Sequence, residues 1–166
     1  MVRESILHWG CPVILHLEAK QEGKKGIWKL IERDKQLKCT NCGEAPDHWQ
    51  YVTLLESSPL KGGRGHASFV SKCKLCSRES SIDIIPDSIG KYSSDDEGFK
   101  SVVHFDCRGL EPVDFDARVG WVAEGTDTGT RFEDIDLKEK EWVDYDDKAK
   151  ASVGIYEFEH QFHKEK

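Results

Sequence analysis

The chain of 166 residues lacks any hydrophobic run long enough to cross a bilayer. Its most apolar N-terminal stretch, residues 6–17, is interrupted by His8, Pro12 and His16. A transmembrane helix needs roughly 20 consecutive apolar residues. The alternative interpretation of this stretch is a signal peptide that ends near Ala19. We expect a soluble protein without membrane contact, located in the cytoplasm or also in the nucleus.

An excess of basic side chains is also missing. Lys and Arg number 24, against 31 Asp and Glu, and residues 111–150 alone carry 13 acidic and 6 basic side chains. Proteins that bind nucleic acid usually display a basic stripe, because neutralising phosphates supplies much of their affinity. We therefore expect no nucleic-acid partner.

The common catalytic motifs are absent. The sequence contains no His-Glu-x-x-His, Gly-x-Ser-x-Gly or Walker-type phosphate loop. His66, His160 and His163 stand in no recognisable ligand spacing, and residues 144–147, Asp-Tyr-Asp-Asp, lack the Gly and Glu of a calcium loop. The sequence predicts a protein that is not an enzyme, and an acidic face exposed to solvent at residues 144–147.

Six cysteines are present, and four of them form two Cys-x-x-Cys pairs, Cys39/Cys42 and Cys73/Cys76. A spacing of two residues lets one tight turn aim both thiolates at the same cation, so two pairs supply the four sulfurs of a closed zinc site. A redox-active pair, two disulfides, or a site for Cu(I) or iron are the alternatives. The doubled pair favours structural zinc, because a redox motif needs only one pair.

The turn after the first pair agrees with this interpretation. Gly43 follows Cys42 directly and suits a turn that requires a positive φ angle. Thirty residues separate Cys42 from Cys73. We therefore expect the two turns to lie on separate hairpins that the fold brings together, with the metal locking this long-range contact.

Short apolar runs separated by Gly, Pro, Ser and charged clusters predict many short strands. Expected strands are residues 13–19, 27–31, 48–55, 67–72, 81–85, 101–107 and 154–162, with one or two more in 113–123. One short helix is expected in residues 137–152. Such a pattern is typical of an all-β single-domain sandwich or barrel, with the two cysteine turns at one end.

Several single residues have two possible roles. Trp121, Trp142 and Tyr145 form either a binding surface with aromatic anchors in an acidic rim or part of the core. Cys107 faces the inner side of its predicted strand, which favours a buried, inert thiol. His16 and His104 are expected on the polar sides of their strands.

Taken together, these motifs resemble the eukaryotic CXXC-motif-containing zinc-binding protein family, a family of uncharacterised function. The resemblance rests on six segments in the family order: Cys39-Thr-Asn-Cys-Gly-Glu, Trp49-Gln-Tyr, Leu60-Lys-Gly-Gly-Arg-Gly, Lys72-Cys-Lys-Leu-Cys, Cys107-Arg-Gly-Leu-Glu-Pro-Val-Asp-Phe and Ser152-Val-Gly-Ile-Tyr-Glu. It implies an all-β fold of two similar, intertwined halves, with zinc ligands at Cys39, Cys42, Cys73 and Cys76.

The resemblance covers roughly residues 13–162. Residues 1–12 are therefore expected to be an N-terminal extension ahead of a zinc-binding β domain of residues 13–163. His66 departs from the small residue expected in the glycine loop.

The expected function is that of a non-catalytic protein with one structural zinc ion per chain, acting as a monomer that binds an unidentified protein partner. Intracellular handling of zinc or copper is the alternative, and a thiol oxidoreductase is a third interpretation.

Overall fold

The fold is described from a computed structural model. It covers residues 2–8, 13–16, 28–30, 37–46, 50–52, 57–61, 65–93, 96, 99–115, 117 and 119–164, with only the backbone considered before residue 37 and at residue 51. Within these ranges the chain forms seventeen strands, one 3-10 helix at Pro86–Ser88 (η1) and no α-helix. The predicted all-β class is confirmed. Among the described residues, no helix has the length and apolarity needed to span a membrane.

Five antiparallel strands form the larger sheet, in the order β17-β1-β11-β9-β8. Their bounds are Val2–His8 (β1), Phe69–Lys72 (β8), Glu79–Ile85 (β9), Lys100–Arg108 (β11) and Glu159–Lys164 (β17). The segment expected as an extension, residues 1–12, thus contributes a strand inside this sheet, between the last strand of the chain and β11.

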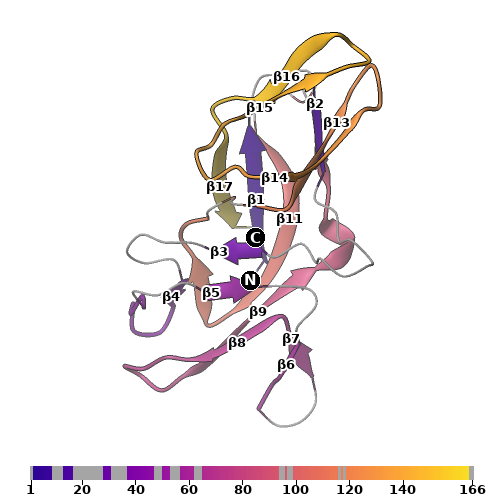
Figure 1. The fold of residues 1–166 in the computed structure, drawn as a ribbon. Coiled ribbons are helices and arrows are strands. Elements are labelled where there is room, and N and C mark those ends of the chain that lie inside the picture. The colour runs from indigo at the N-terminus through magenta and orange to yellow at the C-terminus, as the bar shows by residue number, and fades with distance from the viewer. Residues whose placement is uncertain are drawn as a thin grey trace.

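Four strands form the second sheet, in the order β10-β2-β13-β14. Their bounds are Lys91–Tyr92 (β10), Val13–His16 (β2), Trp121–Gly125 (β13) and Arg131–Ile135 (β14). Along the chain, strands of the two sheets alternate repeatedly, from β1 to β2, back to β8 and β9, and so on to β17 (Figure 1). The two sheets are therefore intertwined in sequence.

The remaining strands form four small antiparallel pairs: Leu37–Cys39 (β4) with Leu110–Pro112 (β12), Trp142–Asp146 (β15) with Ala151–Ile155 (β16), Trp28–Leu30 (β3) with Gln50–Val52 (β5), and Ser58–Pro59 (β6) with His66–Ala67 (β7). The β15–β16 hairpin lies at one end of the molecule, while β4 and the β8–β9 hairpin lie toward the other (Figure 1).

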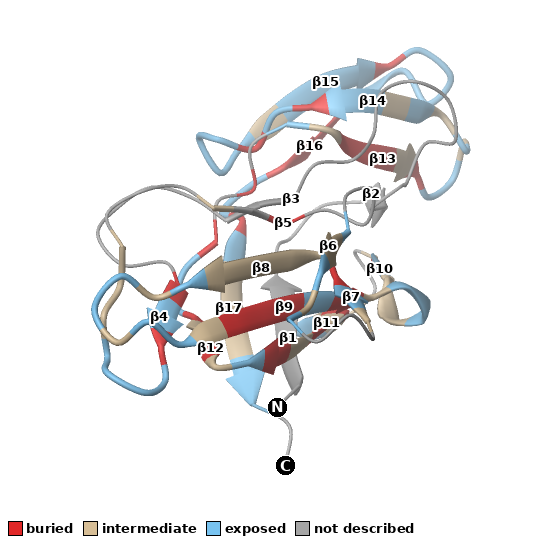
Figure 2. Ribbon diagram, turned by 90° about the horizontal axis from the view of Figure 1, so that it is seen from below, coloured by how far each residue is buried: buried red, intermediate tan, exposed pale blue. Residues whose placement is uncertain are grey.

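A single hydrophobic core joins the two sheets. Along β11, Val103, Phe105 and Cys107 are buried, and His104 and Asp106 between them are half-buried. The same cluster includes Trp121 of β13. Its ring packs edge-on against that of Phe158, with the ring centroids 5.7 Å apart. The buried colour accordingly marks β9 in the lower part of Figure 2 and β13 in the upper part. Val102 is buried as well, at 2% exposure, so the alternation holds only from Val103 to Cys107. The predicted inward position of Cys107 is confirmed.

The short helix predicted within residues 137–152 is wrong, because this segment contains β15 and the start of β16. The charged residues that suggested a helix form a tight turn instead. Asp146 Oδ1 accepts hydrogen bonds from the backbone N–H groups of Lys148 and Ala149, and Lys150 takes a positive φ of 53°. A side chain that caps its own following backbone competes with helix formation.

The strand predicted at residues 154–162 is broken in two. Glu157 has a φ of 55°, so β16 ends at Ile155 and β17 begins at Glu159. An unbroken strand at 154–162 would place Tyr156 and Phe158 on one face. Tyr156 is exposed and Phe158 is buried, so this expectation from the sequence is wrong. Of the residues described within 113–123, which omit 116 and 118, the last three lie in a strand, β13. The predicted strands 13–19, 27–31 and 48–55 extend beyond the described ranges at their ends.

Candidate metal centre

The first cysteine turn follows β4, which ends at Cys39. The Cys39 carbonyl accepts the Gly43 N–H at 2.9 Å, and the Cys39 N–H donates to the Glu44 carbonyl at 2.7 Å. Gly43 has the predicted positive φ, at 77°. The turn is held from outside by β12, because Cys39 pairs with Leu110 and the Thr40 N–H donates to the Gly109 carbonyl.

The second turn connects β8 and β9 and has the same backbone hydrogen bonds. The Cys73 carbonyl accepts the Ser77 N–H, and the Cys73 N–H donates to the Arg78 carbonyl, both at 2.9 Å. Ser77 occupies the position that Gly43 has in the first turn, with a φ of 58°. The second turn is a hairpin as predicted, whereas β4 pairs with a strand some seventy residues later in the chain.

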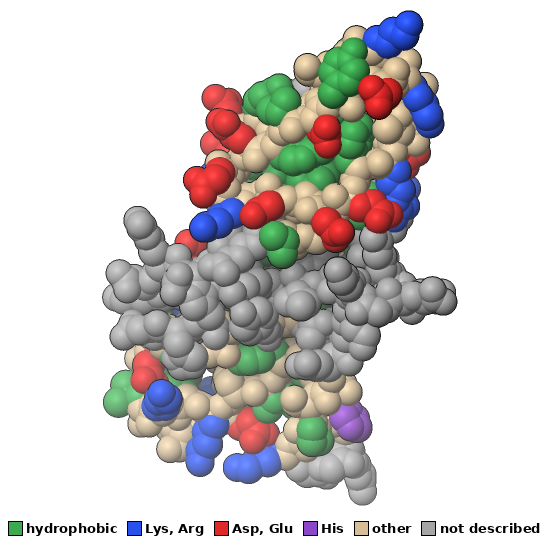
Figure 3. Space-filling model, viewed as in Figure 1, with side chains coloured by type: hydrophobic (Ala, Val, Ile, Leu, Met, Phe, Trp, Pro, Cys, Tyr) green, Lys and Arg blue, Asp and Glu red, His purple; other side chains and the backbone are tan. Residues whose placement is uncertain are grey.

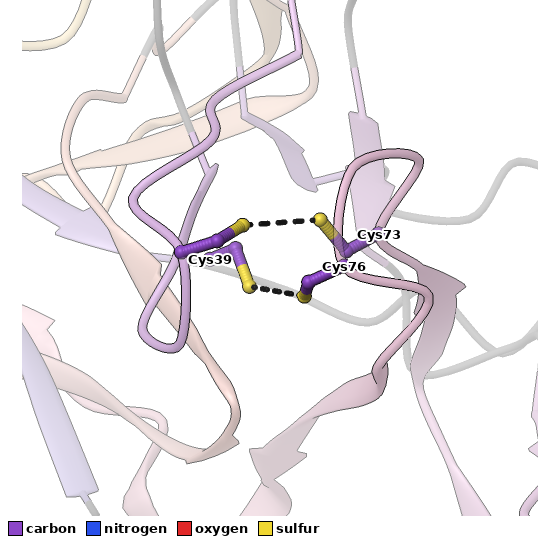
Figure 4. A group of neighbouring side chains, drawn as sticks. Cys39, Cys73 and Cys76 are labelled. Carbon is purple, nitrogen blue, oxygen red and sulfur yellow. Dashed lines mark hydrogen bonds between the residues drawn. The ribbon is translucent and has the colours of Figure 1, made fainter.

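The two turns face each other and bring the four predicted ligands together (Figure 4). Sγ of Cys39 lies 3.8 Å from Sγ of Cys76, and Sγ of Cys42 lies 3.5 Å from Sγ of Cys73. All four sulfurs lie within 4.8 Å of one another. A zinc ion with four Zn–S bonds of about 2.3 Å has sulfurs about 3.8 Å apart. The observed spacing therefore fits one tetrahedral cation.

The four sulfurs differ in their exposure to solvent. Cys39 is buried, Cys73 and Cys76 are half-buried, and Cys42 is exposed. No disulfide joins the five cysteines within the described ranges, and Cys107 lies in the core, away from the four-sulfur cluster. Cys11 lies outside the described residues.

Hydrogen bonds from backbone N–H groups lower the pKa values of three cysteine thiols, and other neighbours act against them at two of the three. A hydrogen bond from the Arg78 N–H, helped by the Asn41 side chain, lowers the pKa of Cys76 to about 6. At Cys73 the backbone bond from residue 76 lowers the pKa, but the neighbouring Glu44 carboxylate and burial outweigh it and raise the pKa to about 12. The Glu44 N–H likewise lowers the pKa of Cys42, but burial and the thiols of Cys76 and Cys39 raise it, and the net shift is upward. Such N–H donors stabilise the thiolate form, which is the form that binds metal.

Glu44 is a residue of the site that the sequence analysis did not single out. Its Oε2 accepts a hydrogen bond from Cys73 Sγ at 2.7 Å and from the Leu75 N–H at 2.9 Å. These two bonds lower the pKa of the Glu44 carboxyl group. Its position directly after Cys-Gly in the first motif was the available signal, but the partner turn that it reaches is 29 residues away.

The remaining candidates lie apart from this cluster. His66 is exposed in β7 and is not among the grouped ligands. His104 is half-buried, with Nε2 3.0 Å from Ser101 Oγ. Trp121 belongs to the core, Trp142 packs against it and Tyr145 is 52% exposed, so the three aromatics do not form one surface. The His16 side chain lies outside the described part of the structure.

An all-β chain whose two Cys-x-x-Cys turns meet in one four-sulfur cluster has the ligand set of the class of proteins with a closed zinc site. The model of the family "CXXC motif containing zinc binding protein, eukaryotic" matches residues 21–163, and the chain belongs to this family. The resemblance seen in the sequence is thereby confirmed, and the cysteine cluster is compatible with a zinc site.

Two relatives in sequence carry the name of the same family. The chain is 62% identical over 130 residues to a CXXC motif containing zinc binding protein of Xenopus laevis, covering 78% of this chain and 81% of the frog protein. The human relative of that name is 59% identical over 128 residues, covering 76% and 80%.

Two solved structures have the same fold. The crystal structure of C1orf123 superimposes with a TM-score of 0.86 at 46% identity over 99% of both chains. A hypothetical protein from Plasmodium falciparum gives a TM-score of 0.82 at 19% identity, covering 98% of this chain and 99% of that one, a likeness of fold alone.

Proposed function

We propose that this protein is a non-catalytic interaction module whose fold is locked by one zinc ion per chain, bound by Cys39, Cys42, Cys73 and Cys76. The observation that carries the proposal is the distance of at most 4.8 Å among four sulfurs from two turns that share the same pattern of backbone hydrogen bonds. One metal ion there ties the end of β4 to the β8–β9 hairpin. Zinc binding releases of order 10 kcal/mol in small zinc peptides, which is comparable to the stability of a whole domain.

A set of four sulfur ligands argues against a catalytic metal. Catalytic zinc sites keep one coordination position open for water or substrate, whereas four protein ligands close the tetrahedron. The Glu44 carboxylate lies beside the sulfurs, and both hydrogen bonds that it accepts come from the second turn. The site therefore supports a structural role.

The proposed partner is another protein. The net charge of −7 disfavours nucleic acid, because like charges repel the phosphate backbone. We propose that the protein acts as a monomer in the cytoplasm, where the reducing environment keeps the thiols available for metal.

Native mass spectrometry with elemental analysis tests the zinc-locked module, before and after a strong chelator, with folding followed by circular dichroism. We expect one zinc per chain and a loss of β structure when zinc is removed. The Cys107→Ala variant, which leaves all four ligands in place, should still carry one zinc. A chain that keeps its fold without metal would contradict the structural role.

A second candidate, metal handling, is favoured by one observation: Cys42 is exposed and two other sulfurs are half-buried. Exposed thiolates allow an incoming ligand to displace a bound soft ion such as zinc or Cu(I). Isotope exchange of bound zinc in the presence of a competing chelator separates the two candidates. Exchange within seconds with an intact fold supports metal handling, whereas exchange only upon unfolding supports the structural role.

A further inference from the structure

Three large hydrophobic side chains are exposed together at one hairpin. Val143 is 55% exposed, Tyr145 is 52% exposed and Tyr156 is 41% exposed. Val143 and Tyr145 lie on β15, and Tyr156 directly follows β16. Scattered exposed apolar residues need no explanation, but a contiguous group on one element marks an interaction surface.

The strand register places the two β15 side chains on the outward face of the hairpin. Trp142 packs on Phe132 with ring centroids 5.2 Å apart, and Asp146 is 1% exposed, so these alternate residues point inward. Val143 pairs with Gly154, and Tyr145 pairs with Ser152. Because residues of a strand alternate between faces, Val143, Tyr145, Ser152 and Gly154 share the outer face.

Gly154 shows how Tyr156 joins this face. A Cβ atom at Gly154 would lie 3.2 Å from both Cζ and Oη of Tyr156 and 2.6 Å from the Trp142 carbonyl oxygen. The Tyr156 ring therefore folds back over the strand, into the space that a side chain at position 154 would occupy. We call Val143, Tyr145, Ser152, Gly154 and Tyr156 the tyrosine face.

The surroundings of the tyrosine face are acidic. Residues 131–159 contain ten acidic and five basic side chains, which account for most of the net charge of −7. Glu141, Asp144, Asp147 and Glu157 are exposed next to the face in sequence. On the lobe at the upper end of Figure 3, hydrophobic side chains lie among acidic ones.

We infer that the tyrosine face docks a basic, extended segment of a partner protein, an inference that rests on the proposed interaction function. Arg and Lys side chains are attracted to the faces of tyrosine rings, and the acidic rim adds long-range attraction. A nucleic acid or an anionic membrane is disfavoured because both are repelled by this rim. A second copy of the chain is disfavoured because a two-fold contact would place two acidic faces against each other.

The test uses the zinc-loaded full chain and two 12-residue peptides, one of four Arg-Leu-Lys repeats and one of four Glu-Leu-Glu repeats. Binding is followed by NMR amide shifts and by fluorescence anisotropy. We expect the basic peptide to shift the amide signals of residues 143, 145, 152 and 156. We also expect its affinity to fall as the salt concentration rises. The double variant Tyr145→Ser/Tyr156→Ser should lose at least tenfold in affinity, while Tyr145→Phe/Tyr156→Phe retains it.

The control variant is Val119→Ser, which removes a 61% exposed side chain outside the tyrosine face and should bind within twofold of wild type. Equal affinity of wild type and the serine double variant, shifts mapping to another surface, or equal binding of the acidic peptide would each overturn the inference. A chain that holds one structural zinc yet fails this test leaves the zinc-locked module standing. If the chain keeps its fold and its peptide binding after chelation, the proposed structural role of zinc is wrong, and the inference about the tyrosine face still holds.

Discussion

Glu44 and Cys73 are joined across the two cysteine turns by a hydrogen bond of 2.7 Å from the Cys73 thiol to the Glu44 carboxylate. The same carboxylate oxygen accepts the Leu75 N–H at 2.9 Å. Glu44 follows the first turn, whereas Cys73 and Leu75 belong to the second. One side chain thus positions the second pair of sulfurs relative to the first.

Replacing Glu44 by Ala should weaken zinc binding by about tenfold. The Leu75 N–H bond to Glu44 persists when Cys73 loses its proton to bind zinc, and it holds the second turn in place. Residues that orient metal ligands typically contribute 10- to 100-fold to affinity. Competition with a chromophoric chelator measures this change. Glu44→Gln can still accept the Leu75 N–H and should lose less. The matched control is Glu139→Ala, an exposed acid in the β14–β15 connection, and equal loss in both variants would remove Glu44 from the site.

Single Ser substitutions at Cys42 and at Cys76 should each abolish stoichiometric zinc binding, because a hydroxyl is a poor ligand for a soft site. Elemental analysis of the purified variants is the measurement. Cys107→Ala should keep one zinc per chain and lose only thermal stability, because Cys107 is 3% exposed in the core. Full zinc occupancy in Cys76→Ser would show that the cluster is not the metal centre.

Asp146 should make stability depend on pH in the acid range. Its carboxylate accepts hydrogen bonds from Thr128 and Thr130 and from the backbone of residues 148 and 149. The hydrogen bond from Thr128 has the largest effect on the pKa of Asp146. Together these hydrogen bonds outweigh burial, which raises the pKa, and lower it to about 2. The ordinary value in an unfolded chain is about 3.9.

Because the folded pKa is the lower one, this contribution is fully present above about pH 4 and is lost as pH falls toward about 2. At pH 6, Asp146→Asn should lower Tm by roughly 3 °C or more. The Tm difference between wild type and variant should shrink below pH 4. Both proteins are measured in the zinc-loaded form, so that zinc loss in acid lowers both Tm values alike and drops out of the difference. Asp147→Asn, at an exposed neighbour, should change Tm little at any pH, and a constant Asp146→Asn effect across this range would refute the assignment.

Gly154→Ala should destabilise the protein by about 1–3 kcal/mol, because its Cβ would lie 2.6 Å from the Trp142 carbonyl oxygen, a backbone atom that cannot move aside cheaply. Gly90→Ala is the matched control, since its nearest neighbour would be at 3.6 Å, an ordinary contact. Urea unfolding of both variants is the measurement. Equal stabilities would show that β15 yields to the methyl group.

Much of the metal centre could be predicted from sequence because ligand chemistry is local. Cys39 and Cys42 lie within one turn, and so do Cys73 and Cys76, so the spacing of two residues already specifies each half of the cluster. Gly43 signalled the positive φ of the first turn. Ser77, with the same φ, gave no such signal, because serine rarely adopts it.

The hairpin of β15 and β16 shows where local reasoning failed. Residues 137–152 are rich in Lys and Glu, which favour helix in isolation. Strand pairing of Trp142 with Ile155 and the burial of Asp146 against Thr128 and Thr130 stabilise the hairpin instead. These contacts join residues up to 18 positions apart. A helical pattern in the sequence relates only residues three or four positions apart, so it carries no sign of them.

The sequence by itself determined the all-β class and the four cysteines that form the cluster, because strand alternation and Cys-x-x-Cys spacing are properties of a few consecutive residues. Only the tertiary structure decided that the first seven-residue strand lies between β17 and β11, that Glu44 reaches the second cysteine turn, and that two tyrosines remain at the surface beside an acidic rim. Each of these depends on which distant segments pair, and pairing is settled by the cooperative packing of the whole core.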